Sequence, residues 1–157
     1  MITTQTTNLK KHVSDHRGVA AVECALVAPL LVLIAMGSID AGQYVNVAQI
    51  VNDASYAGAR QASQNSVLNQ SDVETTVLNY ISTQFSDVSA GDLNTALTVN
   101  VRDTLDAAIP NGNMASVPSG DAVSVQVIFK YNTVRWMHGF LGFDDVSIET
   151  KTVMRRE

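Results

Sequence analysis

The chain has 157 residues, of which 46% are hydrophobic and only 16% are charged, and this length suffices for one domain with a modest core. Its net charge is −5, and a basic head followed by an acidic body argues against nucleic-acid binding, which needs a cationic face. A single cysteine, Cys24, excludes an intramolecular disulfide and a cysteine-based zinc site.

Residues 1–18 form a polar, basic leader without helical periodicity. Three basic residues against one acidic residue give this leader a charge of +2, so the rest of the chain carries −7. A basic head of this kind stays on the cytoplasmic side of a membrane-spanning segment. His12 and His16 have the spacing of two metal ligands on a helix, but no third ligand is near, and we predict no metal site.

The next segment, residues 19–39, is an apolar run that contains one charge, Glu23. A helix of about 20 apolar residues spans the roughly 30 Å hydrocarbon core of a bilayer, so we predict a transmembrane helix here. Pro29 is expected to kink this helix. Cys24 lies inside the run and is expected to act as a small hydrophobic residue.

The helical pattern continues beyond Asp40. Apolar and small residues recur at spacings of three and four, which is the period of a helix face. We therefore predict one long helix over residues 19–63, whose second half is amphipathic and leaves the membrane. Small residues four apart, Ser38–Gly42 and Ala54–Gly58, would allow close helix packing.

Residues 64–157 are expected to form a small exported domain. Ser71, with Glu74 three residues later, resembles a capping box and predicts a short helix that ends near residues 87–91. Alternation with a period of two then predicts three strands, over residues 97–102, 123–134 and 146–152, separated by loops at 109–120 and 136–145. A short helix and a three-stranded antiparallel sheet packed against the long helix make the predicted fold class α+β and pilin-like.

The junction between the leader and the apolar run carries the most information. It reads KKHVSDHRG and then VAAVE: basic residues, a glycine, four small apolar residues and a glutamate. Gly18 gives a protease close access to the backbone. An uncompensated carboxylate in an apolar helix is costly and requires a partner.

This segment resembles type IV pilins and pseudopilins, and more closely the TadE-like family of the tight-adherence pilus system. Residues 17–63 carry the resemblance: an Arg-Gly followed by Ala or Val, a glutamate, a proline within the helix, and an Ala-Arg pair, here Ala59-Arg60, near its end. The chain departs from the family at Cys24, where an aromatic residue is usual.

The resemblance implies that a prepilin peptidase cuts the chain between Gly18 and Val19. Glu23 would then be the fifth residue of the mature chain. In pilin-like proteins this glutamate is thought to pair with the new α-amino group of a neighbouring subunit. Such pairing is physically reasonable, because a helix N-terminus favours a carboxylate and an ammonium partner offsets its desolvation.

The implied function is that of a minor pilin or pseudopilin in pilus assembly and cell adhesion, without enzymatic activity, cofactor, metal or small-molecule substrate. The implied partners are membrane lipid, other pilin-like subunits, the pilus assembly platform and the prepilin peptidase. The chain would cross the bacterial inner membrane once, with its N-terminus in the cytoplasm and its C-terminal domain in the periplasm or outside the cell.

Other interpretations of the N-terminal half stay open. An unprocessed single-span anchor would let Glu23 snorkel to the interface and would display a binding or structural domain. A cleaved secretory signal would use Ala35-Met36-Gly37 as a fair cleavage site. An exported enzyme is a third alternative, although the sequence contains no Gly-rich phosphate loop, no Gly-x-Ser-x-Gly elbow and no Cys/His dyad.

Several remaining polar and aromatic residues have ordinary interpretations. The carboxylate pairs Asp103/Asp106 and Asp144/Asp145 do not fit a calcium loop and are expected on the solvated surface. His138 is expected in a turn. Three aromatic residues between glycines are expected to pack under the sheet or, alternatively, to form an exposed contact patch: Trp136, Phe140 and Phe143.

Overall fold

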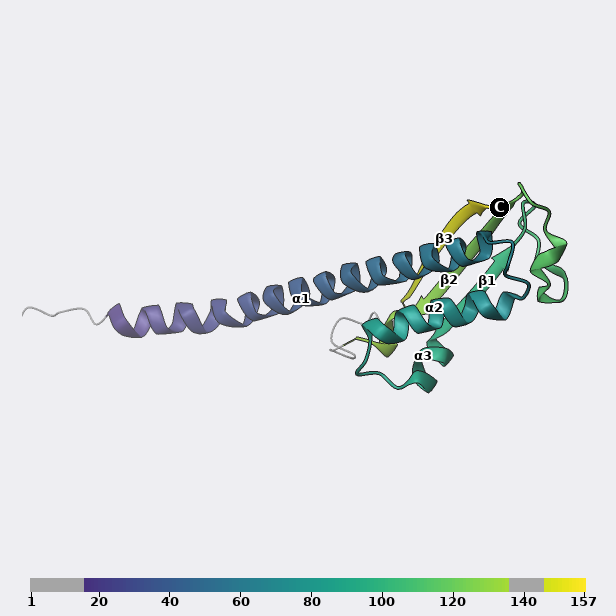
Figure 1. Cartoon of the computed structure of the whole chain (residues 1–157). Coiled ribbons are helices and arrows are strands. Elements are labelled where there is room, and N and C mark those ends of the chain that lie inside the picture. Colours follow the sequence, from purple (N-terminus) through teal and green to yellow (C-terminus); the bar gives the residue numbers. More distant parts are fainter. Residues whose placement is uncertain (1–15, 136–145) are drawn as a thin grey trace, which may run out of the picture. The chain divides into compact units, whose positions relative to one another are not determined.

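The computed structural model describes residues 16–135 and 146–157, and its elements follow the predicted order (Figure 1). The helices are α1 (His16–Ser63), α2 (Gln70–Gln84) and α3 (Ala90–Ala96), and the strands are β1 (Leu97–Arg102), β2 (Ala122–Lys130) and β3 (Ser147–Arg155). Short 3-10 turns occupy Pro110–Gly112, Met114–Ser116 and Tyr131–Thr133. The α+β fold class, with its long N-terminal helix and three-stranded antiparallel sheet, is therefore confirmed.

The chain divides into two compact units, residues 1–37 and 38–157. The described part of the first unit is helical, and α1 continues unbroken through Pro29. Side chains 19–35 are all exposed, and the most apolar window of α1 reaches a mean hydropathy of 2.5 with none of it buried in protein. This part of α1 is long and apolar enough to cross a membrane.

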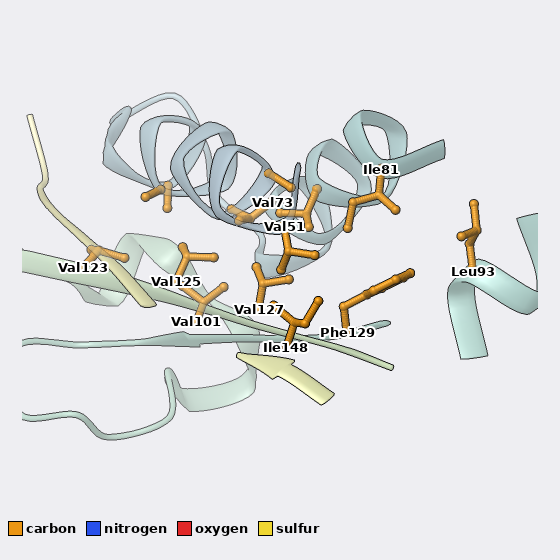
Figure 2. Close-up of a cluster of buried hydrophobic side chains, with 14 of the residues drawn as sticks. Val51, Val73, Ile81, Leu93, Val101, Val123, Val125, Val127, Phe129 and Ile148 are labelled. Atoms are coloured by element: carbon orange, nitrogen blue, oxygen red, sulfur yellow. The ribbon is translucent and has the colours of Figure 1, made fainter. Parts of the chain in front are cut away.

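In the second unit, the sheet has the order β1-β2-β3 and both pairings are antiparallel. The register pairs Val99 with Val127 and Val127 with Thr150. Alternate residues of the central strand, Val125, Val127 and Phe129, are buried on the face that lies toward the helices (Figure 2). The period-two pattern of the sequence thus corresponds to alternate burial along β2.

The core of the second unit lies between this sheet face and the helices (Figure 2). Both α1 and α2 contribute fully buried valines, such as Val51 and Val77. The helices and sheet approach closely at Gly58, where an added Cβ would lie 2.6 Å from Val77 Cγ2. The small residues Ala54 and Gly58 thus pack inside their own domain. An added Cβ at Gly42 would meet nothing within 4 Å.

The predicted capping box at the start of α2 is wrong. The N-cap is Asn69, two residues before Ser71, so the helix begins at Gln70, and the Asn69 side chain makes no capping bond. A β-bridge between Asn69 and Asn113 fixes the backbone there, and Glu74 instead accepts a hydrogen bond from the Gln70 side chain at 2.8 Å. Tertiary pairing therefore sets this helix start.

The sequence prediction also missed α3 and misplaced two strand ends. Ser89 caps α3 by accepting a hydrogen bond from the Asp92 N–H at 3.2 Å. Strand β2 ends at Lys130, where a 3-10 turn begins, and β3 extends to Arg155. The expectations for the loop at 136–145, including those for Trp136, His138, Phe140, Phe143 and Asp144/Asp145, lie outside the described residues.

Candidate functional site

The predicted cleavage bond, between Gly18 and Val19, lies in the first turn of α1. Amide groups of the first turn of a helix have no intrahelical acceptors, and helix ends fray. An added Cβ at Gly18 would meet nothing within 4 Å, and the Val19 side chain is exposed. The backbone at this bond is therefore open to an approaching molecule.

Glu23 is exposed and surrounded by apolar side chains of its own helix, such as Val22 and Val27. Within the described part of the chain, no hydrogen bond or ion pair involves its carboxylate. Val19 and Glu23 are four residues apart in a helix, so they share one face with an axial separation of about 6 Å. The three predicted site residues thus lie on two turns at the start of α1.

A second polar site, which the sequence reasoning missed, lies where the apolar run ends. Arg135 holds the buried Asp40 with two hydrogen bonds, Nε to Oδ1 at 3.0 Å and a terminal nitrogen to Oδ2 at 2.7 Å. Tyr131 donates its hydroxyl to Asp40 Oδ1 at 3.3 Å. The Tyr44 ring packs edge-on against Tyr131, with centroids 5.3 Å apart. We call these four residues the Asp40 cluster.

The electrostatics of the Asp40 cluster follow from these contacts. Hydrogen bonds from Arg135, together with its positive charge, lower the pKa of Asp40, although burial opposes this shift. Burial raises the pKa of Tyr131, and the neighbouring Asp40 carboxylate adds to that effect. These contacts favour the ionised form of Asp40, and they join α1, at the first residue after the apolar run, to the segment that follows β2.

A third feature is a hollow of about 420 Å³ on the surface of α1 and α2. It is lined by Asp53, Tyr56, Ala57, Arg60, Gln61, Gln64 and Tyr80. We call it the α1–α2 hollow. The Ala59-Arg60 pair of the sequence motif is split by the fold: Ala59 is buried in the core, whereas Arg60 is exposed at the hollow.

No group of three metal-binding side chains occurs among the described residues. His16 begins α1, and its side chain and the whole of His12 lie outside what the structure describes. The Asp103/Asp106 pair is on the surface, and Asp106 forms an ion pair with Lys151 at 2.6 Å. Lys151 and Arg135 each form an ion pair with a carboxylate of this same chain.

Among the described residues, one exposed apolar helix is long enough to cross a membrane, and it leads into a small α+β domain. Residues 18–60 match the family model described as TadE-like protein, which confirms the resemblance over most of α1. This family comprises structural components related to the tight-adherence pilus and is not known for enzymatic activity. Neither the curated proteins nor the solved structures include a match to the chain.

Proposed function

We propose that the chain is a membrane-anchored, pilin-like subunit that takes part in assembling a tight-adherence type IV pilus, and that a prepilin peptidase cuts it after Gly18. The observation that carries the proposal is the open Gly18–Val19 bond in the first turn of α1. It is followed by Glu23, a carboxylate in an apolar helix without protein cover. The family match over residues 18–60 supports the same assignment.

The proposed topology places residues 19–39 across the bacterial inner membrane. The basic leader stays in the cytoplasm, because positive charges resist translocation. The folded domain is then periplasmic or extracellular. The position of Asp40 supports this division, since it is the first residue along α1 that is buried in protein and fixed by side-chain hydrogen bonds.

In this proposal Glu23 acts after the cut. Cleavage would start the helix at Val19 and move Glu23 from the eighth position of α1 to the fifth, closer to the positive end of the helix dipole. Removing a carboxylate from water is costly unless a charge partner is present. The α-ammonium of a neighbouring mature subunit supplies that partner, so Glu23 docks one subunit beside another in lipid.

The test is the mass and N-terminal sequence of the chain in cells with an active prepilin peptidase. We expect a chain that begins at Val19. Gly18→Val should remain uncut, because a branched side chain next to the bond hinders the close approach of the protease. Gly37→Val is the matched control, because Gly37 is an equally open glycine of the same helix, and it should be cut normally.

A full-length wild-type chain in those membranes would contradict processing and favour the unprocessed single-span anchor. Glu23→Gln separates the two roles of this segment. The substitution removes the charge and keeps the shape of the side chain. The variant protein should therefore still be membrane-bound, but fewer neighbouring subunits should copurify with it. Unchanged recovery would show that the Glu23 charge plays no part in docking.

A further inference from the structure

The stretch of α1 that follows Asp40 has an exposed side without charge. We call residues 41–45 the boundary turn. Val45 is 54% exposed and Tyr44 is 38% exposed, and an added Cβ at Gly42 would meet nothing within 4 Å. Residues 41–52 contain no charged residue. The exposed side of the boundary turn therefore carries no charge that would oppose contact with lipid.

In the proposed topology, helix geometry places the boundary turn at the level of the lipid headgroups. Ile39 is the last residue of the apolar run, and its side chain is exposed. At 1.5 Å per residue, the Tyr44 Cα lies about 7 Å beyond the Ile39 Cα along the helix. The headgroup layer on each side of a bilayer is about 5–7 Å thick. Residues 38–45 belong to one compact unit and one continuous helix, so this distance along the helix is fixed.

The Tyr44 side chain points back toward the apolar run. Helical side chains tilt toward the N-terminus of their helix. The Tyr44 ring packs edge-on against Tyr131, whose hydroxyl donates to the Asp40 carbonyl oxygen at 3.3 Å. Within the part of the chain that the structure describes, the Tyr44 hydroxyl makes no hydrogen bond. A tyrosine with a packed ring and an available hydroxyl is typical of the interface between membrane and water.

The ion pair of the Asp40 cluster adds little free charge at this level. A carboxylate one residue beyond the apolar run would be costly beside hydrocarbon without a partner. Arg135 donates to both carboxylate oxygens of Asp40, and Asp40 is only 6% exposed. Gln43 also donates to Val134 O at 2.9 Å, so the boundary turn is held against the segment that follows β2.

We propose that the boundary turn contacts the headgroups of the surrounding phospholipid, and that the Tyr44 hydroxyl donates to their phosphate or ester oxygens. Tyr44 thereby sets the depth at which α1 lies in the bilayer. The inference rests on the proposed function, because it takes residues 19–39 as the membrane span. It goes further by assigning a lipid contact to residues of the folded domain.

The test is the depth of a fluorescent label on the full chain in phosphatidylcholine vesicles. In a Cys24→Ala background, Val45→Cys and Asn52→Cys each carry the polarity-sensitive fluorophore NBD. Asn52 is the matched control, because it is exposed on nearly the same side of α1, two helical turns further on. Lipids with a nitroxide on the headgroup should quench the label at position 45 at least about threefold more, because it lies about 10 Å closer to the apolar run.

The role of Tyr44 has its own readout in the labelled Val45→Cys chain. Tyr44→Ala should lower the quenching by about twofold or more, because the chain loses an interfacial aromatic side chain. Tyr44→Phe keeps the ring that packs against Tyr131 but removes the hydroxyl, and it should lose part of the quenching. A role in packing alone would leave Tyr44→Phe identical to the wild type, and that result would overturn the proposed headgroup hydrogen bond.

Two further results would overturn the inference. One is equal quenching of the labels at positions 45 and 52. The other is a short-wavelength emission at position 45 without quenching by the nitroxide lipid, which would indicate that protein, such as a second copy, covers the boundary turn. If the chain sediments with the vesicles in those samples, the proposed function stands and only the headgroup contact fails. A chain that does not bind vesicles at all would instead contradict the proposed function.

Discussion

Among the glycines of α1, Gly58 has the least room for a side chain. An added Cβ would lie 2.6 Å from Val77 Cγ2 and 3.3 Å from Val125 Cγ1. We predict that Gly58→Ala destabilises the domain by about 1–3 kcal/mol, the usual cost of overpacking a core, although alanine favours the helix.

The control for this prediction is Gly42→Ala, a change at an open glycine of the same helix. It should raise stability by about 0.5–1 kcal/mol, because it brings the helix-propensity gain without a clash. Both effects are measured by urea unfolding of the detergent-solubilised chain, followed by far-ultraviolet circular dichroism. Equal shifts in the two variants would show that the close approach at Gly58 is absent.

Asp40 should make the stability of the domain depend on pH, with a loss of stability toward low pH. Its pKa lies below the ordinary value of 3.8 because of the hydrogen bonds and charge of Arg135. The unfolded chain therefore takes up this proton first as the pH falls. The stability that Asp40 contributes is complete above pH 3.8 and is lost as the pH drops through the lowered, folded-state pKa.

We predict that Asp40→Asn loses about 3 kcal/mol at neutral pH, because it breaks a buried pair and leaves the guanidinium without its carboxylate. In the Asp40→Asn variant, the part of the acid-induced loss of stability that Asp40 causes should be absent. Asp106→Asn is the matched control: its ion pair is exposed, and asparagine tolerates the positive φ of Asp106. Unfolding curves between pH 2 and 7 test both, and similar losses at neutral pH would contradict the role of the Asp40 cluster.

At the scale of elements, Arg156 joins two segments that are distant from it in sequence. Its guanidinium donates to Asn65 Oδ1 at 3.3 Å, to Val67 O at 3.2 Å, and to Met114 O. The side chain is buried, whereas its neighbour Arg155 is exposed on β3. This one side chain therefore fixes the segments that follow α1 and precede β2.

We predict that Arg156→Ala destabilises the domain by about 1–3 kcal/mol, because it leaves the buried Val67 carbonyl without this donor and removes a buried side chain. Arg155→Ala removes the same charge from the adjacent position and should change stability by less than about 0.5 kcal/mol. Thermal unfolding of the two variants side by side measures the difference. Equal effects would mean that charge, and not the buried hydrogen bonds, is what matters here.

The elements that could be predicted from sequence are those with a long, regular pattern. The helix period of α1 and the period-two alternation of β1 and β2 were sufficient, because burial on one face enforces both patterns. The seven residues of α3 are too few to show a period. The start of α2 was misread because the bridge from Asn69 to Asn113 overrides the local capping signal.

A candidate site could be predicted from sequence only where its residues are close together in the chain. Gly18, Val19 and Glu23 are neighbours in the sequence, so their arrangement could be predicted without a structure. Asp40 and Arg135 are 95 positions apart, and no local pattern indicates that they meet. From the sequence, Asp40 is only the first polar residue after the apolar run. This gives its position correctly but does not indicate its contact with Arg135.

At the scale of the whole molecule, the two compact units differ in where their apolar side chains lie. Every buried residue that the structure describes lies at Asp40 or later, and the second unit begins at Ser38. The apolar part of α1 therefore adds nothing to the protein core, and its exposed side chains are suited to lipid. The described core of the domain is therefore complete without the apolar part of α1.

This separation predicts that a chain beginning at Ser38 folds as a soluble domain, since it keeps the core and the Asp40 cluster. A chain beginning at Ala41 lacks only three further residues but loses Asp40, so it should be about 3 kcal/mol less stable, as for any broken buried pair. Size-exclusion chromatography and urea unfolding of the two proteins make the comparison. If both were equally stable, α1 would be anchored to the sheet by Ser55 and the valine core alone, and the Asp40 cluster would be dispensable.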